Sequence, residues 1–323
     1  MNRSICVCLE FLTEALREKI EKAAAAEGFT VCFAENEEDA RAHLADCEIL
    51  FAHSVPLVQA APATLKWYCC AYAGVDPYCR NDGIFANPDC LLSNSSGAYG
   101  VTIAEHILMV ALMLLRRMPE YQETVRRRGW ENSLPIRSIR SSRITVLGAG
   151  NIGSTFASRA RGFEPERITG VSRSGIAREA VYDEMLPFSR LDEVLPRTDI
   201  LVMALPGTPE TVGLLSRERL ALLPAHAIVI NVGRGTALDQ DALMDALNHD
   251  RLGGAALDVM MPEPLPPDHP LWNTRHLIIT PHIAGNMTLG YTCERAVEMF
   301  CEDLKNYAEG RPLLRLVDRS RGY

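Results

Sequence analysis

The sequence predicts an α/β protein built from two doubly wound parallel sheets. Two series of short apolar runs alternate with helical segments, one before residue 98 and one after residue 142. Strands that alternate with helices form parallel sheets whose two faces the helices cover. With 323 residues, 47% of them hydrophobic, the chain is long enough for about two such domains.

The first series of expected strands comprises residues 4–9, 30–33, 48–52, 66–70 and 90–93. A helix rich in Ala, Glu and Lys ends near Glu27, and a second, charged helix follows residue 33. The stretch 95–100 contains two glycines and leads into an apolar helix expected over residues 101–118. Its longest apolar run, 107–115, meets Arg116 and Arg117 and is too short to span a bilayer.

The second series begins at Arg143 and comprises residues 143–147, 168–171, 200–205, 227–231, 254–257 and 277–280. These runs predict a second doubly wound sheet. One long helix is expected over residues 291–307, with no further strand series after it. We therefore expect the C-terminal segment to pack on the first domain.

Charge and cysteine content restrict the function. A net charge of −8 disfavours nucleic acid and acidic membrane surfaces as partners. The ten cysteines lack the paired spacing of a zinc site, so we expect buried thiols, no metal and a reducing compartment. The first residues do not have the pattern of a signal peptide. These features predict a cytoplasmic protein.

A dinucleotide-binding loop is predicted at residues 148–153. Gly148, Gly150 and Gly153 form a G-x-G-x-x-G pattern that directly follows an apolar strand and opens a helical stretch. Glycines at this spacing allow a tight turn and let the backbone approach a pyrophosphate at the helix N-terminus. The context predicts a Rossmann cofactor domain.

The end of the next strand favours NADP over NAD. NAD-selective sites place an acidic residue there for the ribose 2′-hydroxyl, whereas this strand ends in Ser172, Arg173 and Ser174. A guanidinium pairs well with a 2′-phosphate, and the two serine hydroxyls can add hydrogen bonds. We therefore predict a preference for NADP.

Three residues at or near the ends of later strands are suited to carbonyl reduction. Arg234 follows a glycine in a turn, Glu263 lies between two prolines, and His282 follows Pro281. Ligands of open parallel sheets bind beyond the carboxyl ends of the strands. The three residues can supply an anion clamp, an orienting carboxylate and an acid/base group.

These motifs resemble the D-isomer-specific 2-hydroxyacid dehydrogenase family over nearly the whole length. The resemblance is carried, in family order, by residues 148–153, by 231–235, by 256–259 with 263–265, and by 280–285. The 172–174 loop and the 265–272 segment are most similar to the glyoxylate/hydroxypyruvate reductase branch. The resemblance implies a Rossmann domain, residues 99–287, inserted into a flavodoxin-like substrate domain, residues 1–98 and 288–323.

The resemblance also implies catalytic roles. Arg234 would bind the carboxylate and the 2-oxo oxygen of a small 2-oxoacid, because a guanidinium fork can hold both. His282 would donate a proton to that oxygen during hydride transfer, and would act as the base in the reverse direction. Glu263 would orient His282 and favour its protonated form.

Further binding residues follow from the same resemblance. Backbone N–H groups of Gly74 and Val75 would bind the substrate carboxylate, and Asp258 would anchor the nicotinamide carboxamide. The remaining implied cofactor-binding residues are Asn151, Ile152, Leu205, Pro206, Thr211, Val232, Gly233 and Gly285. The helix over residues 101–115 is a candidate homodimer element, with a monomer's core helix as the alternative.

Two other functions fit parts of the sequence. A phosphoglycerate dehydrogenase-like enzyme would need extra cationic residues near residues 72–78, where only Arg80 is basic. A dinucleotide-sensing, corepressor-like scaffold could keep the same three catalytic residues. Turnover itself distinguishes a reductase from the scaffold.

Overall fold

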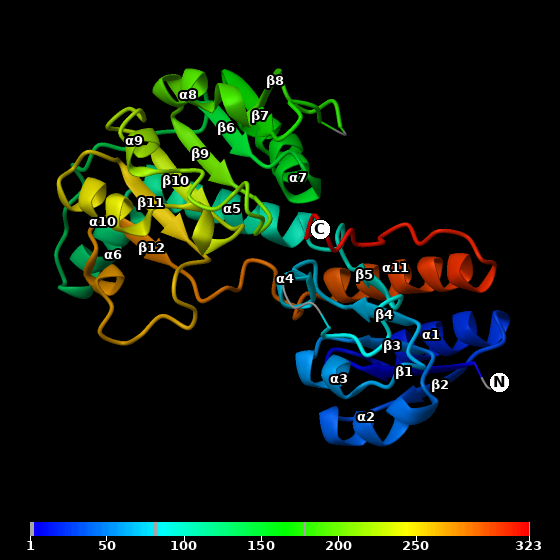
Figure 1. The fold of residues 1–323 in the computed structure, drawn as a ribbon. Helices are drawn as coiled ribbons and strands as arrows, with labels where there is room; N and C mark the ends of the chain where they lie inside the picture. The colour runs from blue at the N-terminus through cyan, green and yellow to red at the C-terminus, as the bar shows by residue number, and fades with distance from the viewer. Residues whose placement is uncertain (1–2, 80–82, 178, 323) are drawn as a thin grey trace. The chain divides into compact units, whose positions relative to one another are not determined.

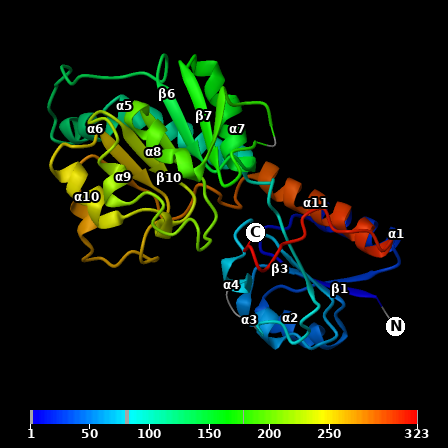
Figure 2. The ribbon, with the colours of Figure 1, turned by 45° about the horizontal axis from the view of Figure 1, so that its top comes forward.

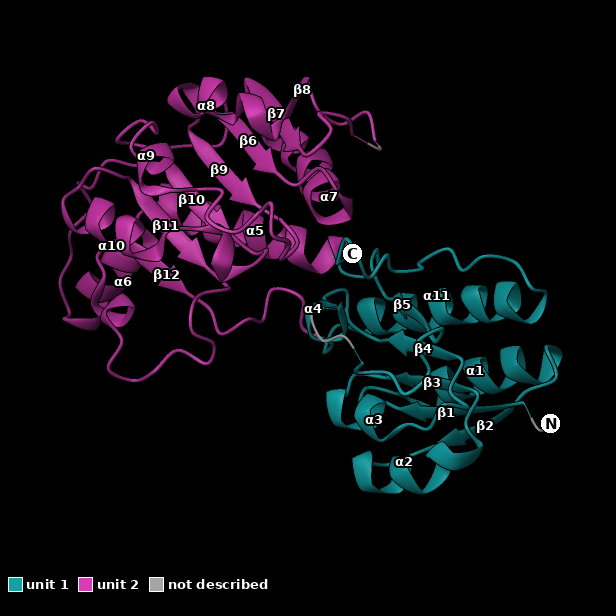
Figure 3. Cartoon of the chain, in the orientation of Figure 1, with its two compact units in different colours: residues 1–99, 287–323 teal, residues 100–286 magenta. Residues whose placement is uncertain are grey.

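The chain divides into two compact units (Figure 3). The computed structural model describes residues 3–79, 83–177 and 179–322. Unit 1 comprises residues up to Tyr99 and from Met287 onwards, and unit 2 comprises Gly100–Asn286. Each unit contains one parallel sheet, so the predicted α/β class with two parallel sheets is confirmed.

Unit 1 has a five-stranded sheet of order β2-β1-β3-β4-β5, the flavodoxin-like order. The strands are β1 (Ser4–Cys8), β2 (Thr30–Phe33), β3 (Ile49–Ala52), β4 (Trp67–Cys70) and β5 (Leu91–Asn94). The helices are α1 (Glu14–Ala26), α2 (Glu37–His43), η1 (Leu44–Asp46), α3 (Val55–Ala60), α4 (Asp76–Cys79) and α11 (Gly290–Ala308).

The two faces of this sheet have separate cores, because successive strand residues point to opposite sides. Ile5 and Val7 pack with α1 and α11, which lie side by side on one face (Figures 1 and 2). Cys6 and Leu50 pack toward α2 and α3 on the other face. On the first face, the rings of Phe51 and Phe300 stack with centroids 4.3 Å apart.

Unit 2 has a seven-stranded parallel sheet of order β12-β11-β10-β9-β6-β7-β8. The strands are β6 (Arg143–Leu147), β7 (Arg167–Ser172), β8 (Glu184–Pro187), β9 (Ile200–Met203), β10 (Ile228–Asn231), β11 (Gly254–Leu257) and β12 (Leu277–Ile279). The helices are α5 (Gly100–Leu115), α6 (Met118–Arg126), α7 (Asn151–Ala160), η2 (Arg161–Phe163), η3 (Phe188–Arg190), α8 (Leu191–Val194), η4 (Leu195–Arg197), α9 (Arg217–Leu220), η5 (Gly235–Ala237), α10 (Gln240–Asn248) and η6 (Pro270–Asn273).

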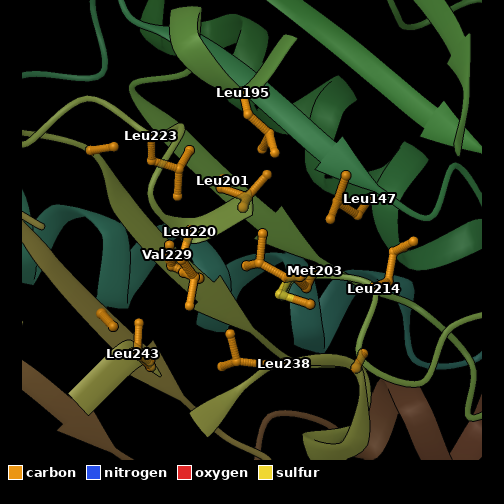
Figure 4. Packing of buried hydrophobic residues seen from close by; sticks show 14 of the residues in the cluster. Leu147, Leu195, Leu201, Met203, Leu214, Leu220, Leu223, Val229, Leu238 and Leu243 are labelled. Carbon is orange, nitrogen blue, oxygen red and sulfur yellow. The ribbon is translucent and has the colours of Figure 1, made fainter. Parts of the chain in front are cut away.

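The main core of unit 2 lies between the sheet and the helices α8, α9 and α10. Leu201 and Met203 of β9 and Val229 of β10 contact Leu220 and Leu243 there (Figure 4). Helix α5 contacts β10 and β11 and packs along α7. The sheet is therefore covered by helices, which explains why its central strands read as continuous apolar runs.

Three details differ from the sequence-based expectation. The apolar helix ends at Leu115 instead of residue 118, because Arg117 adopts a left-handed conformation with φ of 56°. A separate helix, α6, begins at Met118 and has no buried residue, so no apolar stripe indicated it. The edge strand β8 was also not predicted, because a glutamate and a proline flank its two apolar residues and leave no apolar run.

No described helix combines the length and the apolar composition that a bilayer crossing requires. Over residues 3–79, 83–177 and 179–322, no group of three or more His, Cys, Asp or Glu side chains is arranged to hold a metal ion. The cysteines are thiols, six of them buried.

Candidate active site

The predicted site residues of unit 2 lie in loops at one edge of its sheet. Strands β6, β9, β10, β11 and β12 are parallel neighbours, so their carboxyl ends share that edge. The loops after these strands carry residues 148–153, 204–211, 232–235, 258–263 and 280–285. This edge is where open parallel sheets bind ligands.

The glycine loop fits the diphosphate of a dinucleotide. Gly148 has φ of 100°, and a Cβ at Gly153 would run into the backbone carbonyl of Gly148, so both positions need glycine. Gly150 caps α7 without any side-chain hydrogen bond, and a Cβ there would meet nothing within 4 Å. The N-terminus of α7 therefore has room for a phosphate beside its backbone N–H groups.

Asn151 and Ile152 form the first turn of α7. Asn151 is exposed and Ile152 is partly buried. A Cβ on Gly100 would lie 2.6 Å from the Asn151 side-chain oxygen, so α5 starts directly against this turn. The close approach of the two helices fixes the position of the glycine loop.

The loop after β7 has the conformation of a tight turn. The Ser172 hydroxyl donates to the carbonyl of Ile176 at 3.2 Å, and the Ile176 N–H donates to the Ser174 hydroxyl at 3.3 Å. Arg173 between them is exposed. The pKa of Glu210 is lowered by hydrogen bonds from its own backbone N–H and from Thr208, and also by the charge of Arg173. The charge of Arg173 therefore acts on the loop after β9.

The loop after β9 is braced internally. The Thr211 hydroxyl donates to the carbonyl of Pro206 at 2.6 Å, and the Leu205 side chain lies in the main core. A Cβ on Gly233 would lie 2.6 Å from the backbone of Leu205, so the loops after β9 and β10 touch only because residue 233 is glycine. The neighbouring Val232 is buried.

His282 and Glu263 form a hydrogen-bonded pair. The His282 Nδ1 atom lies 2.7 Å from a Glu263 carboxylate oxygen, and the other oxygen accepts the N–H of Met260 at 2.8 Å. His282 has φ of 55°, and its own N–H donates to the carbonyl of Asp258 at 3.0 Å. Glu263 thus leaves His282 Nε2 as the ring nitrogen that can reach a ligand.

The electrostatics of the pair favour the protonated form of the histidine. The hydrogen bond to Glu263 raises the pKa of His282, although burial and the nearby Arg234 guanidinium oppose the rise. Burial would raise the pKa of Glu263, but its hydrogen bonds from His282 and Met260 and the charge of Arg234 lower it overall. The three predicted catalytic residues therefore lie together.

Arg234 is held by the loop after β10. The buried Asn231 side chain donates to the carbonyl of Arg234 at 3.0 Å and accepts the N–H of Gly233 at 3.0 Å. The Arg234 guanidinium donates to the carbonyl of Gly233 at 2.8 Å. Its backbone is therefore fixed, while the side chain is only partly buried.

Asp258 holds the loop that carries His282. Its carboxylate accepts the Thr280 hydroxyl at 2.6 Å and the N–H groups of Ile283 and Ala284 at 2.9 and 3.0 Å. Gly285 follows directly on this loop. A carboxylate has about four acceptor positions, so one remains for another donor.

Gly74 and Val75 belong to unit 1, in the loop after β4. The carbonyl of Ala73 accepts the Asn94 amide at 2.7 Å, and the carbonyl of Val75 accepts the N–H of Tyr78 at 2.9 Å. The loop is thus fixed on both sides of Gly74. Arg80, the basic residue that bears on the phosphoglycerate alternative, lies outside the described residues.

Two residues that the sequence did not single out contact this site. Thr280 bonds Asp258, and His106 of α5 lies 3.3 Å from the Thr280 hydroxyl through its Nε2 atom. In the sequence, His106 stands out only as a titratable residue in an apolar helix, between the buried residues Ile103 and Ile107.

Comparison with known sequences decides the family. The model of the "D-isomer specific 2-hydroxyacid dehydrogenase, NAD binding domain" matches residues 108–284, more than half of the chain. The chain belongs to the D-isomer specific 2-hydroxyacid dehydrogenase family. The resemblance predicted from the four motifs is thereby confirmed, and unit 2 contains the family's NAD binding domain.

Individual members of the family match most of the chain. The glyoxylate/hydroxypyruvate reductase A of Escherichia fergusonii is 32% identical over 279 residues, which cover 83% of this chain and 85% of that protein. A family member from Aeromonas salmonicida has a solved structure with a TM-score of 0.86 and 31% identity, covering 99% of this chain and 100% of that one. A dehydrogenase from Xanthobacter autotrophicus, solved with NADPH, has a TM-score of 0.81 and 27% identity, and each chain is covered completely.

Proposed function

We propose that this 2-hydroxyacid dehydrogenase reduces a small 2-oxoacid, such as glyoxylate or hydroxypyruvate, to the D-2-hydroxyacid. The observation that carries the proposal is the His282–Glu263 hydrogen bond of 2.7 Å, which raises the pKa of His282 beside the charge of Arg234. A ketone becomes an alcohol when it receives a hydride on carbon and a proton on oxygen. NADPH supplies the hydride when it is bound, and this chain supplies the proton.

His282 is the proton donor in this mechanism. Glu263 occupies Nδ1, so the proton leaves from Nε2 to the 2-oxo oxygen. Near neutral pH an imidazolium is a suitable general acid, and a positioned acid accelerates such a step by about 10²- to 10⁴-fold. In the oxidation direction, neutral His282 accepts the alcohol proton at the same nitrogen.

Arg234 binds the substrate in our proposal. Its guanidinium can donate to the carboxylate and to the 2-oxo oxygen together, which orients the carbonyl toward His282. The backbone N–H groups of Gly74 and Val75 add donors for the carboxylate. Arg234 thus stabilises the negative charge that develops on the carbonyl oxygen, and His282 protonates that oxygen.

The cofactor proposal is NADP in preference to NAD. The Xanthobacter relative was solved with NADPH, and here Arg173 stands where an NAD-selective site has an acid. The remaining acceptor position of Asp258 suits the N–H₂ of a carboxamide. We assign the other cofactor contacts to the glycine loop, to Ser172 and Ser174, and to the loops containing Asn151, Ile152, Leu205, Pro206, Thr211, Val232, Gly233 and Gly285.

Domain roles and assembly complete the proposal. Residues 99–287 form the dinucleotide-binding domain, and residues 1–98 and 288–323 form the substrate domain. We propose a homodimer, because α5, α6 and the segment after them expose apolar side chains, namely Met109, Val125, Trp130 and Ile136. The thiol side chains suit a reducing cytoplasm, and the net charge of −8 gives no attraction to nucleic acid.

The experiment is to follow the loss of reduced-nicotinamide absorbance with glyoxylate, hydroxypyruvate and phenylpyruvate, using NADPH and NADH in parallel. We expect turnover with at least one 2-oxoacid, and faster turnover with NADPH. Binding of NADPH without turnover of any 2-oxoacid would contradict the reductase proposal and favour a sensing protein. Faster turnover with NADH would contradict the cofactor proposal alone.

A further inference from the structure

A partly buried polar cluster of three side chains adjoins the loop that carries His282. His106 comes from α5, Asp258 follows β11, and Thr280 follows β12. The His106 side chain is 10% exposed and the Asp258 side chain 3%. Polar groups this deeply buried are costly unless they are hydrogen-bonded, so the contacts of the cluster indicate its role.

The distances fix the direction of the hydrogen bonds. Thr280 Oγ1 lies 2.6 Å from Asp258 Oδ1, and an ionised carboxylate only accepts, so the threonine hydroxyl is the donor. The oxygen of that hydroxyl then accepts from His106 Nε2 at 3.3 Å. The result is a chain of donors from the His106 ring through Thr280 to Asp258.

Asp258 also holds the loop that carries His282. Its two carboxylate oxygens accept the N–H groups of Ile283 and Ala284, the two residues that follow His282. His282 itself has a left-handed backbone, with φ of 55°, which histidine rarely adopts without support from its surroundings. The orientation of the Asp258 carboxylate therefore determines where the loop holds His282.

We propose that His106 is a positioning residue that keeps His282 in place through Thr280 and Asp258. With the His106 donor present, the Thr280 hydroxyl directs its hydrogen to Asp258 Oδ1. Without it, the hydroxyl rotates more freely and the carboxylate loses a fixed partner. The N–H bonds to residues 283 and 284 then weaken, and the catalytic ring is less well aligned with the substrate.

The role requires a neutral ring. Burial lowers the pKa of His106, and only the charge of Asp258 opposes this. Asp258 Oδ1 lies 4.0 Å from His106 Nε2. A charged ring at that distance would attract the carboxylate away from the N–H groups that it holds, whereas a neutral ring donates without this competition.

The test rests on the proposed reductase activity and compares variants of His106 and Thr280 with a control. His106→Leu removes the donor, His106→Gln keeps an N–H near the position of Nε2, and His249→Gln alters an exposed histidine beyond α10 as the control. We expect His106→Leu to lower kcat about five- to tenfold, the effect of one lost hydrogen bond. KM for the 2-oxoacid should stay within about twofold, and His106→Gln should restore most of kcat. Thr280→Val should show the same loss, and adding His106→Leu to it should lower kcat no further.

Amide hydrogen exchange provides a readout that does not need turnover. The N–H groups of Ile283 and Ala284 should exchange faster in His106→Leu and Thr280→Val than in wild type or His249→Gln. Unchanged exchange in His106→Leu would overturn the inference, as would equal loss of kcat in the Leu and Gln variants. If no 2-oxoacid is reduced, the proposed function fails, and the exchange experiment still decides the role of His106.

Discussion

Replacing Glu263 by Gln tests whether the Glu263 carboxylate raises the pKa of His282. A glutamine side chain has the shape of the glutamate, and its amide oxygen can still accept from Nδ1, which lies 2.7 Å from the carboxylate in the wild type. The substitution removes the negative charge and, because an amide has a single oxygen, also the acceptor for the Met260 N–H. Since the hydrogen bond to Glu263 is the main cause of the raised pKa of His282, the pKa should fall in the variant.

The size of the effect follows from the exposure of the ring. A hydrogen bond between charged groups contributes about 1.5–3 kcal/mol when it is shielded. The His282 side chain is 54% exposed, so solvent screening reduces the contribution to roughly 1–1.5 kcal/mol. Because about 1.4 kcal/mol corresponds to a factor of ten, the proton affinity of the ring should fall about tenfold.

The assay is the pH dependence of kcat/KM in both directions. Reduction needs the protonated ring, so its rate is lost as pH rises through the pKa of His282, and in Glu263→Gln this loss should begin at lower pH. At pH values above the wild-type transition, the variant should reduce the 2-oxoacid about tenfold more slowly than the wild type. In acid, the two rates should differ little. Oxidation needs the neutral ring, so its rising limb should also move to lower pH. A uniform loss at every pH, or an unmoved transition, would refute the role of the Glu263 charge.

Further substitutions test the cofactor site and the fold. Arg173→Ala should raise the Kd of NADPH roughly 10- to 100-fold and the Kd of NADH less than about twofold, as measured by titration. The control Arg190→Ala alters an exposed arginine paired with Glu193 and should change neither Kd. Equal effects of Arg173→Ala on both cofactors would count against a 2′-phosphate contact. Gly153→Ala should lower the free energy of unfolding by about 1–3 kcal/mol in denaturant titrations, because the added Cβ would collide with the backbone carbonyl of Gly148. A Cβ at Gly150 faces open space, so Gly150→Ala should lower the free energy of unfolding by about 1 kcal/mol or less and should mainly weaken cofactor binding. Burial would raise the pKa of Asp199, but its hydrogen bonds outweigh burial and lower the pKa in the folded protein. The ionised carboxylate therefore stabilises the fold at pH values above the ordinary aspartate pKa. This stabilisation is lost as the pH falls through the lower pKa of the folded state. Asp199→Asn should therefore cost about 1–3 kcal/mol at neutral pH and progressively less in acid, and a pH-independent cost would contradict the ionic role.

The strands of both sheets could be predicted because burial on two faces leaves uninterrupted apolar runs. Residues 200–203 and the first three residues of β10 are buried and apolar, and each was recognised. The edge strand β8 has a glutamate and a proline around two apolar residues, so its sequence contains no apolar run. The break at Arg117 depends on a single left-handed residue that composition does not reveal.

The site was predictable where the chemistry is local in sequence. The glycine loop is one contiguous motif, and its turn requires the glycines in the structure as expected from the sequence. The Glu263–His282 pair came from family resemblance, because the two residues are 19 positions apart and periodicity does not connect them. The contact between His106 and Thr280 joins residues 174 positions apart, and only folding brings them together.

The central claim, that this chain reduces a 2-oxoacid by protonation from His282, is tested most directly by two proteins in one assay. NADPH oxidation with hydroxypyruvate is measured for wild type and for His282→Ala, together with the Kd of NADPH for each. We predict turnover by the wild type, a kcat lower by roughly two to four orders of magnitude in the variant, and unchanged NADPH binding. Near-normal turnover by His282→Ala would contradict the account.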